Sequence, residues 1–172
     1  MNDEQVAIVD ENDEVISVQW RNSLRIEKGN YLRYVNIFVI NSKDELLMPI
    51  MSMNRRLFPG CFDFSVAEHV MAGESYDEAA TRGLKEELNL EGTNLRKIGK
   101  VTPKEDMSGF AMTYELVHNG SVPDYDRDGI TGLRWIPITE VLELWSKDKS
   151  KFKGDFIQNF NYWIKNRNKK KD

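Results

Sequence analysis

The chain contains little of several features that would each indicate a particular class of protein. One cysteine, Cys61, among 172 residues excludes an internal disulfide framework and fits a reducing compartment. The apolar runs, such as residues 37–40, are far shorter than the roughly 20 residues that cross a bilayer. Basic charge is not in excess, because 24 lysines and arginines stand against 28 acidic residues. The acidic N-terminus also lacks the layout of a secretion signal. These absences predict a cytoplasmic protein that binds neither nucleic acid nor membrane.

What the chain does contain is typical of a globular protein. Hydrophobic residues make up 40% of it and charged residues 30%. A chain of this length buries about 70% of the surface that it would expose when unfolded. We therefore expect residues 1–172 to form a single domain, with a C-terminal helix over 150–168 and a solvated basic tail over 169–172.

The pattern of apolar residues predicts strands first, then a helix, then more strands and two further helices. Strands are predicted over residues 6–9, 15–18, 31–40, 45–50, 62–66, 95–101, 110–117 and 133–136. Helices are predicted over 76–88, where Ser75 suits the N-cap, and over 139–145 in addition to the C-terminal one. This order indicates an α+β protein in which helices flank a mixed sheet, as in an α/β/α sandwich.

An aromatic stripe follows the predicted C-terminal helix. Phe152, Phe156, Phe160 and Trp163 recur with a helical period. Such a stripe is more typical of a core-facing surface than of a cofactor site. It is also compatible with the interface of a homodimer.

Two residues of the helix over 76–88 break local rules one turn apart. Glu87 falls within an arc that is otherwise apolar, and a buried carboxylate is costly unless it is paired or binds a metal. Gly83 lies in mid-helix, where glycine costs about 1 kcal/mol relative to alanine. One reason for it would be room for another group to approach the backbone. The alternative for Glu87 is a simple ion pair with Arg82 or Arg134.

Residues 68–90 resemble the Nudix box, G-x5-E-x7-R-E-U-x-E-E-x-G-U, in which U is apolar. The matching positions, all at the right spacing, are Glu74, Arg82, Leu84, Glu86, Glu87 and Leu90. The flanking segments 58–60 and 63–66 look like those of the subgroup related to isopentenyl diphosphate isomerase. The resemblance covers about residues 5 to 145 and implies the Nudix-type α/β/α sandwich.

Three positions depart from the box. Asn89 replaces the last glycine, and asparagine also tolerates the left-handed conformation that ends a helix. Gly83 replaces a glutamate that is a metal ligand in the family. Glu68 replaces the first glycine and brings a carboxylate that would restore the missing charge if its loop folds back. Ala67 replaces a glycine whose carbonyl often meets the metal, and it keeps a carbonyl.

The resemblance implies that Mg²⁺ or Mn²⁺ supports hydrolysis of a diphosphate linkage in a small molecule of the nucleoside diphosphate type. It assigns catalysis to Glu86 and Glu87, metal binding to these two with Glu68 and the Ala67 carbonyl, and a structural role to Glu74 and Arg82. Carboxylates and carbonyls are the hard oxygen ligands that Mg²⁺ prefers.

Further residues are candidates for substrate contacts. Arg33, Arg55 and Arg56 are predicted to bind phosphate, because a guanidinium group matches phosphate oxygens. Glu105 and Asp106 are either a further ligand or base, or part of a solvated loop. The aromatic residues Phe58, Tyr114 and Trp135 either stack on a base or pack in the core.

Two alternatives remain. Loss of the carboxylate at Gly83 is compatible with a module that binds a phosphorylated ligand without turnover. His69 matches a metal-binding histidine of the isomerases, which leaves isomerase-like chemistry open. Against it, Ala67 stands where the isomerases have their catalytic cysteine, Cys61 precedes that loop, and Glu115 lacks the paired glutamate of their second metal-binding strand.

Overall fold

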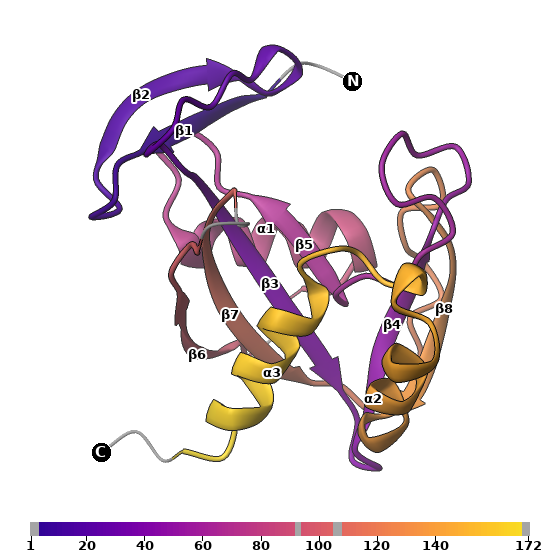
Figure 1. The fold of residues 1–172 in the computed structure, drawn as a ribbon. Coiled ribbons are helices and arrows are strands. Elements are labelled where there is room, and N and C mark those ends of the chain that lie inside the picture. The colour runs from indigo at the N-terminus through magenta and orange to yellow at the C-terminus, as the bar shows by residue number, and fades with distance from the viewer. Residues whose placement is uncertain (1–3, 92–93, 105–107, 170–172) are drawn as a thin grey trace.

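The computed structural model describes residues 4–91, 94–104 and 108–169, which form two sheets and three α-helices (Figure 1). The smaller sheet pairs β1 (Gln5–Val9) with β2 (Val15–Trp20). The larger one contains β3 (Leu32–Ile40), β4 (Glu45–Met51), β5 (Val66–His69), β6 (Arg96–Val101), β7 (Gly109–Val117) and β8 (Ile130–Pro137). The helices are α1 (Tyr76–Leu88), α2 (Ile138–Lys147) and α3 (Phe156–Asn166). Within these residues, no helix is long and apolar enough to span a membrane.

The large sheet divides along one edge of its central strand. Its order is β6-β7-β3-β4-β8, and β3 runs parallel to β7 but antiparallel to β4. β5 pairs with β3 through residues 34–37, whereas β4 meets β3 only at Ile40. Ser65 bridges the resulting gap, because its hydroxyl donates to the Leu47 carbonyl at 2.6 Å and accepts from the Val39 N–H at 2.8 Å. The sheet therefore opens where β4 and β5 diverge.

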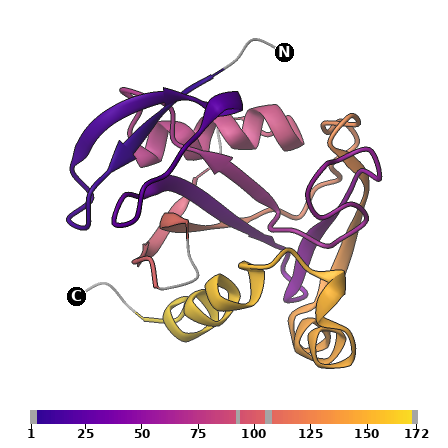
Figure 2. The ribbon, with the colours of Figure 1, turned by 45° about the horizontal axis from the view of Figure 1, so that its top comes forward.

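Helices cover both faces of this sheet, as the second view makes clear (Figure 2). One core lies between the sheet and α1 and includes Val35, Ile37, Val66, Ala80 and Leu84. The other lies against α2 and α3 and includes Phe38, Phe64, Val141, Phe156, Phe160 and Trp163. The α+β class and the α/β/α sandwich predicted from the sequence are thus confirmed.

The signals that begin and end α1 act as predicted. Ser75 is the N-cap: its side chain accepts the Glu78 N–H, and the Glu78 side chain accepts the Ser75 N–H, which completes a capping box. Asn89 ends the helix at φ 50°, in the left-handed region, and its N–H donates to the Lys85 carbonyl at 3.1 Å. The helix bounds agree with the predicted ones.

Two elements begin later in the chain than predicted. The strand expected over residues 62–66 begins only at Val66, because the preceding segment bends into the gap of the sheet. The helix expected over 150–168 begins at Phe156, because residues 149–151 form a 3-10 turn and Phe152 pairs with Phe62 in a parallel bridge. Both segments therefore pair with each other instead of extending a regular element.

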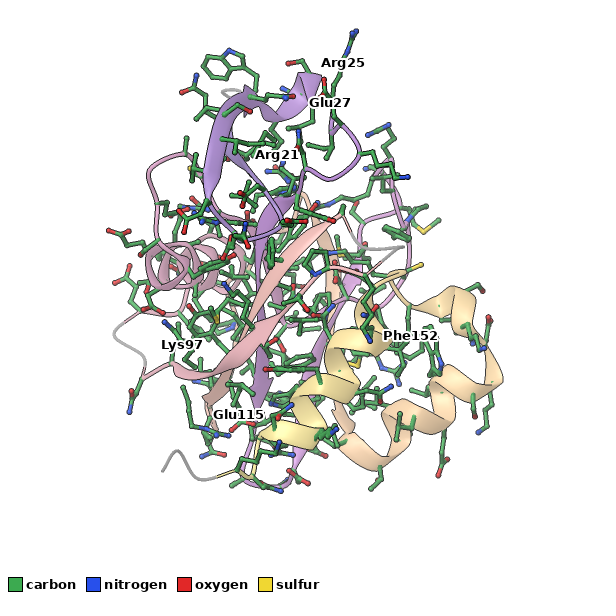
Figure 3. The ribbon with its side chains drawn as sticks, turned by 60° about the vertical axis from the view of Figure 1, so that its left-hand side comes forward. Arg21, Arg25, Glu27, Lys97, Glu115 and Phe152 are labelled. Carbon is green, nitrogen blue, oxygen red and sulfur yellow. The ribbon has the colours of Figure 1, made fainter. Side chains whose placement is uncertain are left out.

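The C-terminal aromatic stripe is a core surface, as predicted. The indole ring of Trp163 stacks on Phe38 with ring centroids 4.5 Å apart. Its N–H donates to the buried carboxylate of Glu115 at 2.8 Å, and Arg167 binds the same carboxylate at 3.2 Å. Figure 3 places Glu115 beside the end of α3. Since this stripe faces inward, it gives no support to a homodimer, which stays a prediction.

Candidate active site

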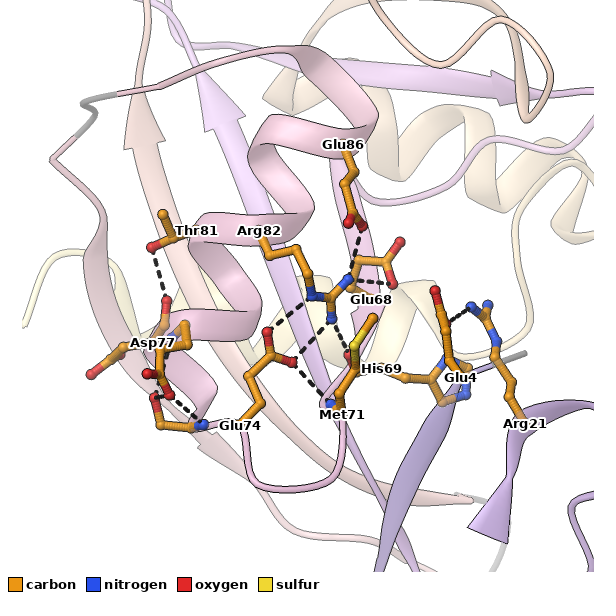
Figure 4. Close-up of polar contacts among 12 residues, drawn as sticks. Glu4, Arg21, Glu68, His69, Met71, Glu74, Asp77, Thr81, Arg82 and Glu86 are labelled. Carbon is orange, nitrogen blue, oxygen red and sulfur yellow. Dashed lines mark hydrogen bonds and ion pairs between the residues drawn. The ribbon is translucent and has the colours of Figure 1, made fainter. Parts of the chain in front are cut away.

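The guanidinium group of Arg82 joins α1 to the loop before it and to β5 (Figure 4). It binds Glu74 through two hydrogen bonds of 2.9 and 3.1 Å and the His69 carbonyl at 2.8 Å. It also donates to Glu86 at 2.9 Å and lies 3.6 Å from Glu68. Burial opposes the charge of Arg82, but hydrogen bonds and the nearby carboxylates outweigh it and raise its pKa. The predicted structural pair of Glu74 and Arg82 is therefore present, within a larger network.

Gly83 gives room for the side chain of Glu68. A Cβ atom at position 83 would lie 2.8 Å from Cγ of Glu68, closer than real Cβ atoms are found, and in a tight contact of 3.0 Å with Cγ1 of Val66. The glycine in mid-helix thus has the physical reason that the sequence suggested, a close approach by another group. The side chain of Glu68 comes from β5 and is only 15% exposed.

Glu87 lies one helical turn after Gly83 and faces β5. Its carboxylate accepts the Ala67 N–H at 3.1 Å. The ion pair with Arg82 or Arg134 considered above is not what the structure contains: Arg82 binds Glu68, Glu74 and Glu86, and Arg134 lies over the Phe62 ring. Glu87 is therefore a largely buried carboxylate without a directly paired cation among the described residues.

Two carboxylates close together in a buried site resist ionisation. Burial raises the pKa of Glu87 well above its usual value, and the charges of Glu68 and Asp63 raise it further. Burial also raises the pKa of Glu68, against the opposing effect of Arg82. His69, next along β5, has its pKa lowered to about 3 by burial and by neighbouring cations, so its imidazole is neutral near pH ~7.

The donor set suits a hard divalent cation, although the side chains are not gathered around one point. Among the described residues, no group of three or more His, Cys, Asp or Glu side chains is arranged so that it could hold a metal ion. Glu86 is the most exposed carboxylate of the set, at 51%, and turns toward Arg82. The negative charge of Glu68, in contrast, disfavours ionisation of Glu87. A cation bound between the two carboxylates would relieve this repulsion.

The sequence of this chain matches that of a known family. Residues 30–160 match the model of the NUDIX domain. The chain belongs to the Nudix hydrolase family. It is 36% identical over 154 residues to an uncharacterised Nudix hydrolase of Nostoc sp., a match that spans 88% of this chain and 90% of the relative.

Two other likenesses agree with this assignment. A crystal structure of a Deinococcus radiodurans protein superposes with a TM-score of 0.83 at 32% identity, over 92% of this chain and 98% of that one. An isopentenyl-diphosphate isomerase of Pectobacterium atrosepticum is 24% identical over 168 residues, which cover 92% of this chain and 93% of the relative. The predicted kinship with Nudix proteins and with isomerases is thus confirmed.

The three arginines expected to bind phosphate have different surroundings in the Nudix fold. The guanidinium group of Arg33 binds both the carboxylate and the backbone carbonyl of Asp13, so its contact with phosphate stays a prediction. Arg55 and Arg56 are exposed on the loop after β4. Arg55 lies 3.9 Å from Asp126, whose N–H donates to the Glu87 carbonyl at 2.9 Å. Arg55 therefore stands near the end of α1 that carries Glu87.

The three aromatic candidates differ in how far they are buried. Tyr114 is buried in the core and its hydroxyl donates to Asp77 at 2.6 Å, whereas Trp135 is half-buried against the α1 core. Phe58 is 41% exposed on the same loop as Arg55, so it is the most exposed of the three. Glu105 and Asp106 lie outside the described residues. The thiol of Cys61 donates to the Ser150 carbonyl at 3.2 Å.

Two charged residues near the Nudix box were missed from the sequence. Asp63 is buried just before β5, and Lys153 approaches it to 3.5 Å from the segment before α3. Asp63 was visible only as part of an apolar flank, and Lys153 as one of many basic residues near the C-terminus. Nothing in their spacing to the box indicates that the gap between β4 and β5 brings them together.

A polar hollow elsewhere on the molecule is separate from this site. It lies between α1, β6 and the end of α3, and its lining includes Asp77, Lys97, Tyr114 and Arg167. None of Glu68, Glu86 and Glu87 lines it. The hollow is therefore not part of the site that carries the Nudix box.

Proposed function

We propose that this Nudix protein hydrolyses a diphosphate linkage in a small molecule of the nucleoside diphosphate type, with Mg²⁺ or Mn²⁺ as cofactor. The observation that carries the proposal is the place of Glu68, whose side chain fills the space beside Gly83. The box has lost a carboxylate on α1 and gained one on β5 at the same spot. Its number of carboxylates is therefore kept.

The residues proposed to hold the metal are Glu68, Glu86, Glu87 and the carbonyl of Ala67. All offer oxygen atoms, as Mg²⁺ and Mn²⁺ prefer. When bound, the metal would neutralise charge on the diphosphate and lower the pKa of an attacking water. Glu68 and Glu86 would have to turn part of the way from Arg82 to serve it.

The protein's own groups have distinct proposed roles. The Ala67 N–H holds one oxygen of Glu87 and leaves the other for the metal or the water. Arg82 is held by Glu74, and its ion pairs with Glu68 and Glu86 orient these two carboxylates. Arg55 and Arg56 are proposed to bind phosphate oxygens, since both are exposed on the loop after β4 and Arg55 lies near the end of α1. Phe58 on the same loop would offer a stacking surface to a base.

A second candidate is a module that binds a phosphorylated ligand without turnover. The observation in its favour is that Arg82 already engages two of the three carboxylates. If that network does not open, the site would bind metal poorly and turnover would be slow or absent.

A screen with purified protein tests the proposal. Nucleoside diphosphates linked to a second group, nucleoside triphosphates and isopentenyl diphosphate are each incubated with Mg²⁺ or Mn²⁺, and product formation is followed. We expect metal-dependent hydrolysis that Glu87→Gln lowers by about a hundredfold or more, the scale of losing a proton-transfer or charge-stabilising group. Glu91→Gln, an exposed carboxylate just after α1, is the matched control and should retain activity.

Other results would overturn the proposal in different ways. Ligand-induced thermal stabilisation without turnover would favour the binding module. Isomerisation of isopentenyl diphosphate would favour the chemistry of the isomerase relatives. Hydrolysis that Glu87→Gln leaves intact would place the reaction elsewhere in the molecule.

A further inference from the structure

Lys153 reaches the Nudix site from a part of the chain outside the box. The backbone on either side of Phe152 is hydrogen-bonded to Phe62: the Phe62 N–H donates to the Lys151 carbonyl at 2.7 Å, and the Lys153 N–H donates to the Phe62 carbonyl at 3.0 Å. Phe152 is buried and its ring packs on that of Phe62 at 5.6 Å. Since successive side chains of an extended segment point to opposite sides, burial of Phe152 directs Lys153 the other way.

The ammonium group of Lys153 lies among groups from several elements. It is 3.5 Å from the carboxylate of Asp63 and 5.3 Å from the centre of the Phe64 ring. Its charge also acts on Glu87 of α1, His69 of β5 and Tyr34 of β3. The side chain is 26% exposed, so solvent or a ligand can reach it. The bridge between Phe62 and Phe152 therefore places it beside the segment that leads into β5, ahead of Ala67 and Glu68.

The ion pair with Asp63 uses only part of the hydrogen-bonding capacity of the Lys153 ammonium group. A separation of 3.5 Å is longer than the 2.7–2.9 Å typical of a charge-assisted hydrogen bond. Asp63 also accepts the Phe64 N–H at 2.7 Å, so it has a partner besides the lysine. An ammonium group has three N–H donors. Within the described residues, the contact with Asp63 takes no more than one of them.

We propose that Lys153 binds a phosphate group of the substrate, while Asp63 holds its side chain in position. A cation there would balance negative charge of a bound diphosphate, in addition to the charge balanced by the metal and by Arg55 and Arg56. Lysine serves this purpose as a point charge on a flexible stem. This inference rests on the proposed function for the identity of the ligand, but its test does not require turnover.

The experiment measures binding of inorganic pyrophosphate to the metal-free protein by isothermal titration calorimetry. Lys153→Met removes the charge and keeps the stem, Lys153→Arg keeps the charge, and Lys151→Met is the matched control, since Lys151 is exposed in the same segment. We expect Lys153→Met to weaken binding by about tenfold or more, the scale of one lost charged hydrogen bond. Lys153→Arg should restore most of the affinity, and Lys151→Met should leave it unchanged.

Kinetics with the best substrate of the screen provide a second reading. Lys153→Met should raise KM more than it lowers kcat, because a phosphate contact made in the ground state is lost. A merely structural lysine would lower the melting temperature without this split. If Lys153→Met fails to fold because Asp63 is left unpaired, Asp63→Asn combined with Lys153→Met removes both charges and is titrated instead.

The failures of the two proposals can be told apart. Wild-type protein that binds pyrophosphate through Lys153 but hydrolyses nothing would contradict the proposed function and support the role of Lys153. Wild-type protein that binds no pyrophosphate, or a folded Lys153→Met variant with unchanged affinity, would overturn the role of Lys153 whatever the activity.

Discussion

The side chain of Glu68 lies where a side chain at Gly83 would have to go. A Cβ atom at position 83 would be 2.8 Å from Cγ of Glu68 and 3.3 Å from its Cβ. In a Nudix box these two positions carry glutamate on the helix and glycine on the strand. Here the two residue types are exchanged. The glycine at position 83 leaves the space that the side chain of Glu68 fills. The two departures are therefore one coupled change.

Adding a side chain at position 83 alone should destabilise the protein. Gly83→Ala gains about 1 kcal/mol of helix propensity, but the new methyl group would overlap Glu68 and Val66. Overpacking of this kind costs about 1–3 kcal/mol. We therefore expect the free energy of unfolding of the variant to be equal to or lower than that of the wild type. Urea denaturation followed by circular dichroism measures it. A clear stabilisation would mean that Glu68 does not occupy the space beside position 83.

The reciprocal exchange tests the coupling itself. Gly83→Glu alone should lose both stability and activity, because two carboxylate side chains would compete for one space. Glu68→Gly alone should lose activity by removing a proposed metal ligand. Combining the two restores the family's usual arrangement, and we expect hydrolysis to recover by about tenfold or more over either single variant, since close positions are not additive. Single-variant losses that simply add in the double variant would contradict the exchange.

This exchange marks the limit of what the sequence could predict about the site. The bounds of α1, its caps and the pair of Glu74 and Arg82 could be predicted, because they depend on local hydrogen bonds and on helical spacing. That Gly83 admits a neighbouring group could be predicted too. Which group it admits depends on the pairing of β5 beside α1, a contact that is distant in the sequence.

The partners of other charged residues also lay beyond the reach of the sequence. The turn between β1 and β2 brings Asp13 to Arg33. Asp63 and Lys153 are separated by ninety positions and meet only because Phe62 pairs with Phe152. The layers of the fold follow from apolar patterns, whereas the partners of individual charges follow from tertiary packing.

Arg82 should be indispensable for stability and not replaceable by lysine. Its planar guanidinium group makes two bonds to Glu74 while also reaching His69 and Glu86, which a single ammonium group cannot do. We expect Arg82→Lys to lower the free energy of unfolding by about 2–4 kcal/mol, because partly buried carboxylates lose their partners. Arg127→Lys, an exposed arginine elsewhere, is the control. Equal unfolding midpoints for these two variants would rule out the network as a source of stability.

Divalent metal should stabilise the folded protein even without substrate. Glu68 and Glu87 repel each other in a buried site, and a cation bound between them would remove that cost. Because the metal would bind the folded state alone, its effect on the melting temperature should grow with concentration. We expect Mn²⁺ or Mg²⁺ to raise the melting temperature of the wild type, with EDTA reversing the shift, and Glu68→Gln to reduce it. A melting temperature that metal leaves unchanged would argue against the proposed ligand set.

Asp13 should make the stability of the protein depend on pH. Its carboxylate is only 8% exposed and binds Arg33 at 2.6 Å and Lys100 at 2.7 Å, so it ties the turn between β1 and β2 to β3 and β6. Burial opposes its ionisation, but the bonds from Lys100 and Arg33 outweigh burial and lower the pKa of Asp13 below 3.8. A carboxylate with a lowered pKa in the folded state contributes stability above its unfolded pKa. That contribution is lost as the pH falls through the folded value.

Asp13→Asn isolates this term, because asparagine tolerates the backbone at φ 65° and removes only the charge. The wild type should exceed the variant by about 1–3 kcal/mol in the free energy of unfolding near pH ~7. The difference should shrink once the pH falls below the ordinary value of 3.8, as the wild-type carboxyl is protonated as well. Glu11→Gln, an exposed carboxylate of the same turn, should follow the wild type throughout. Urea titrations across this pH range decide the matter, since a constant difference would mean that Asp13 acts through its shape and not through its charge.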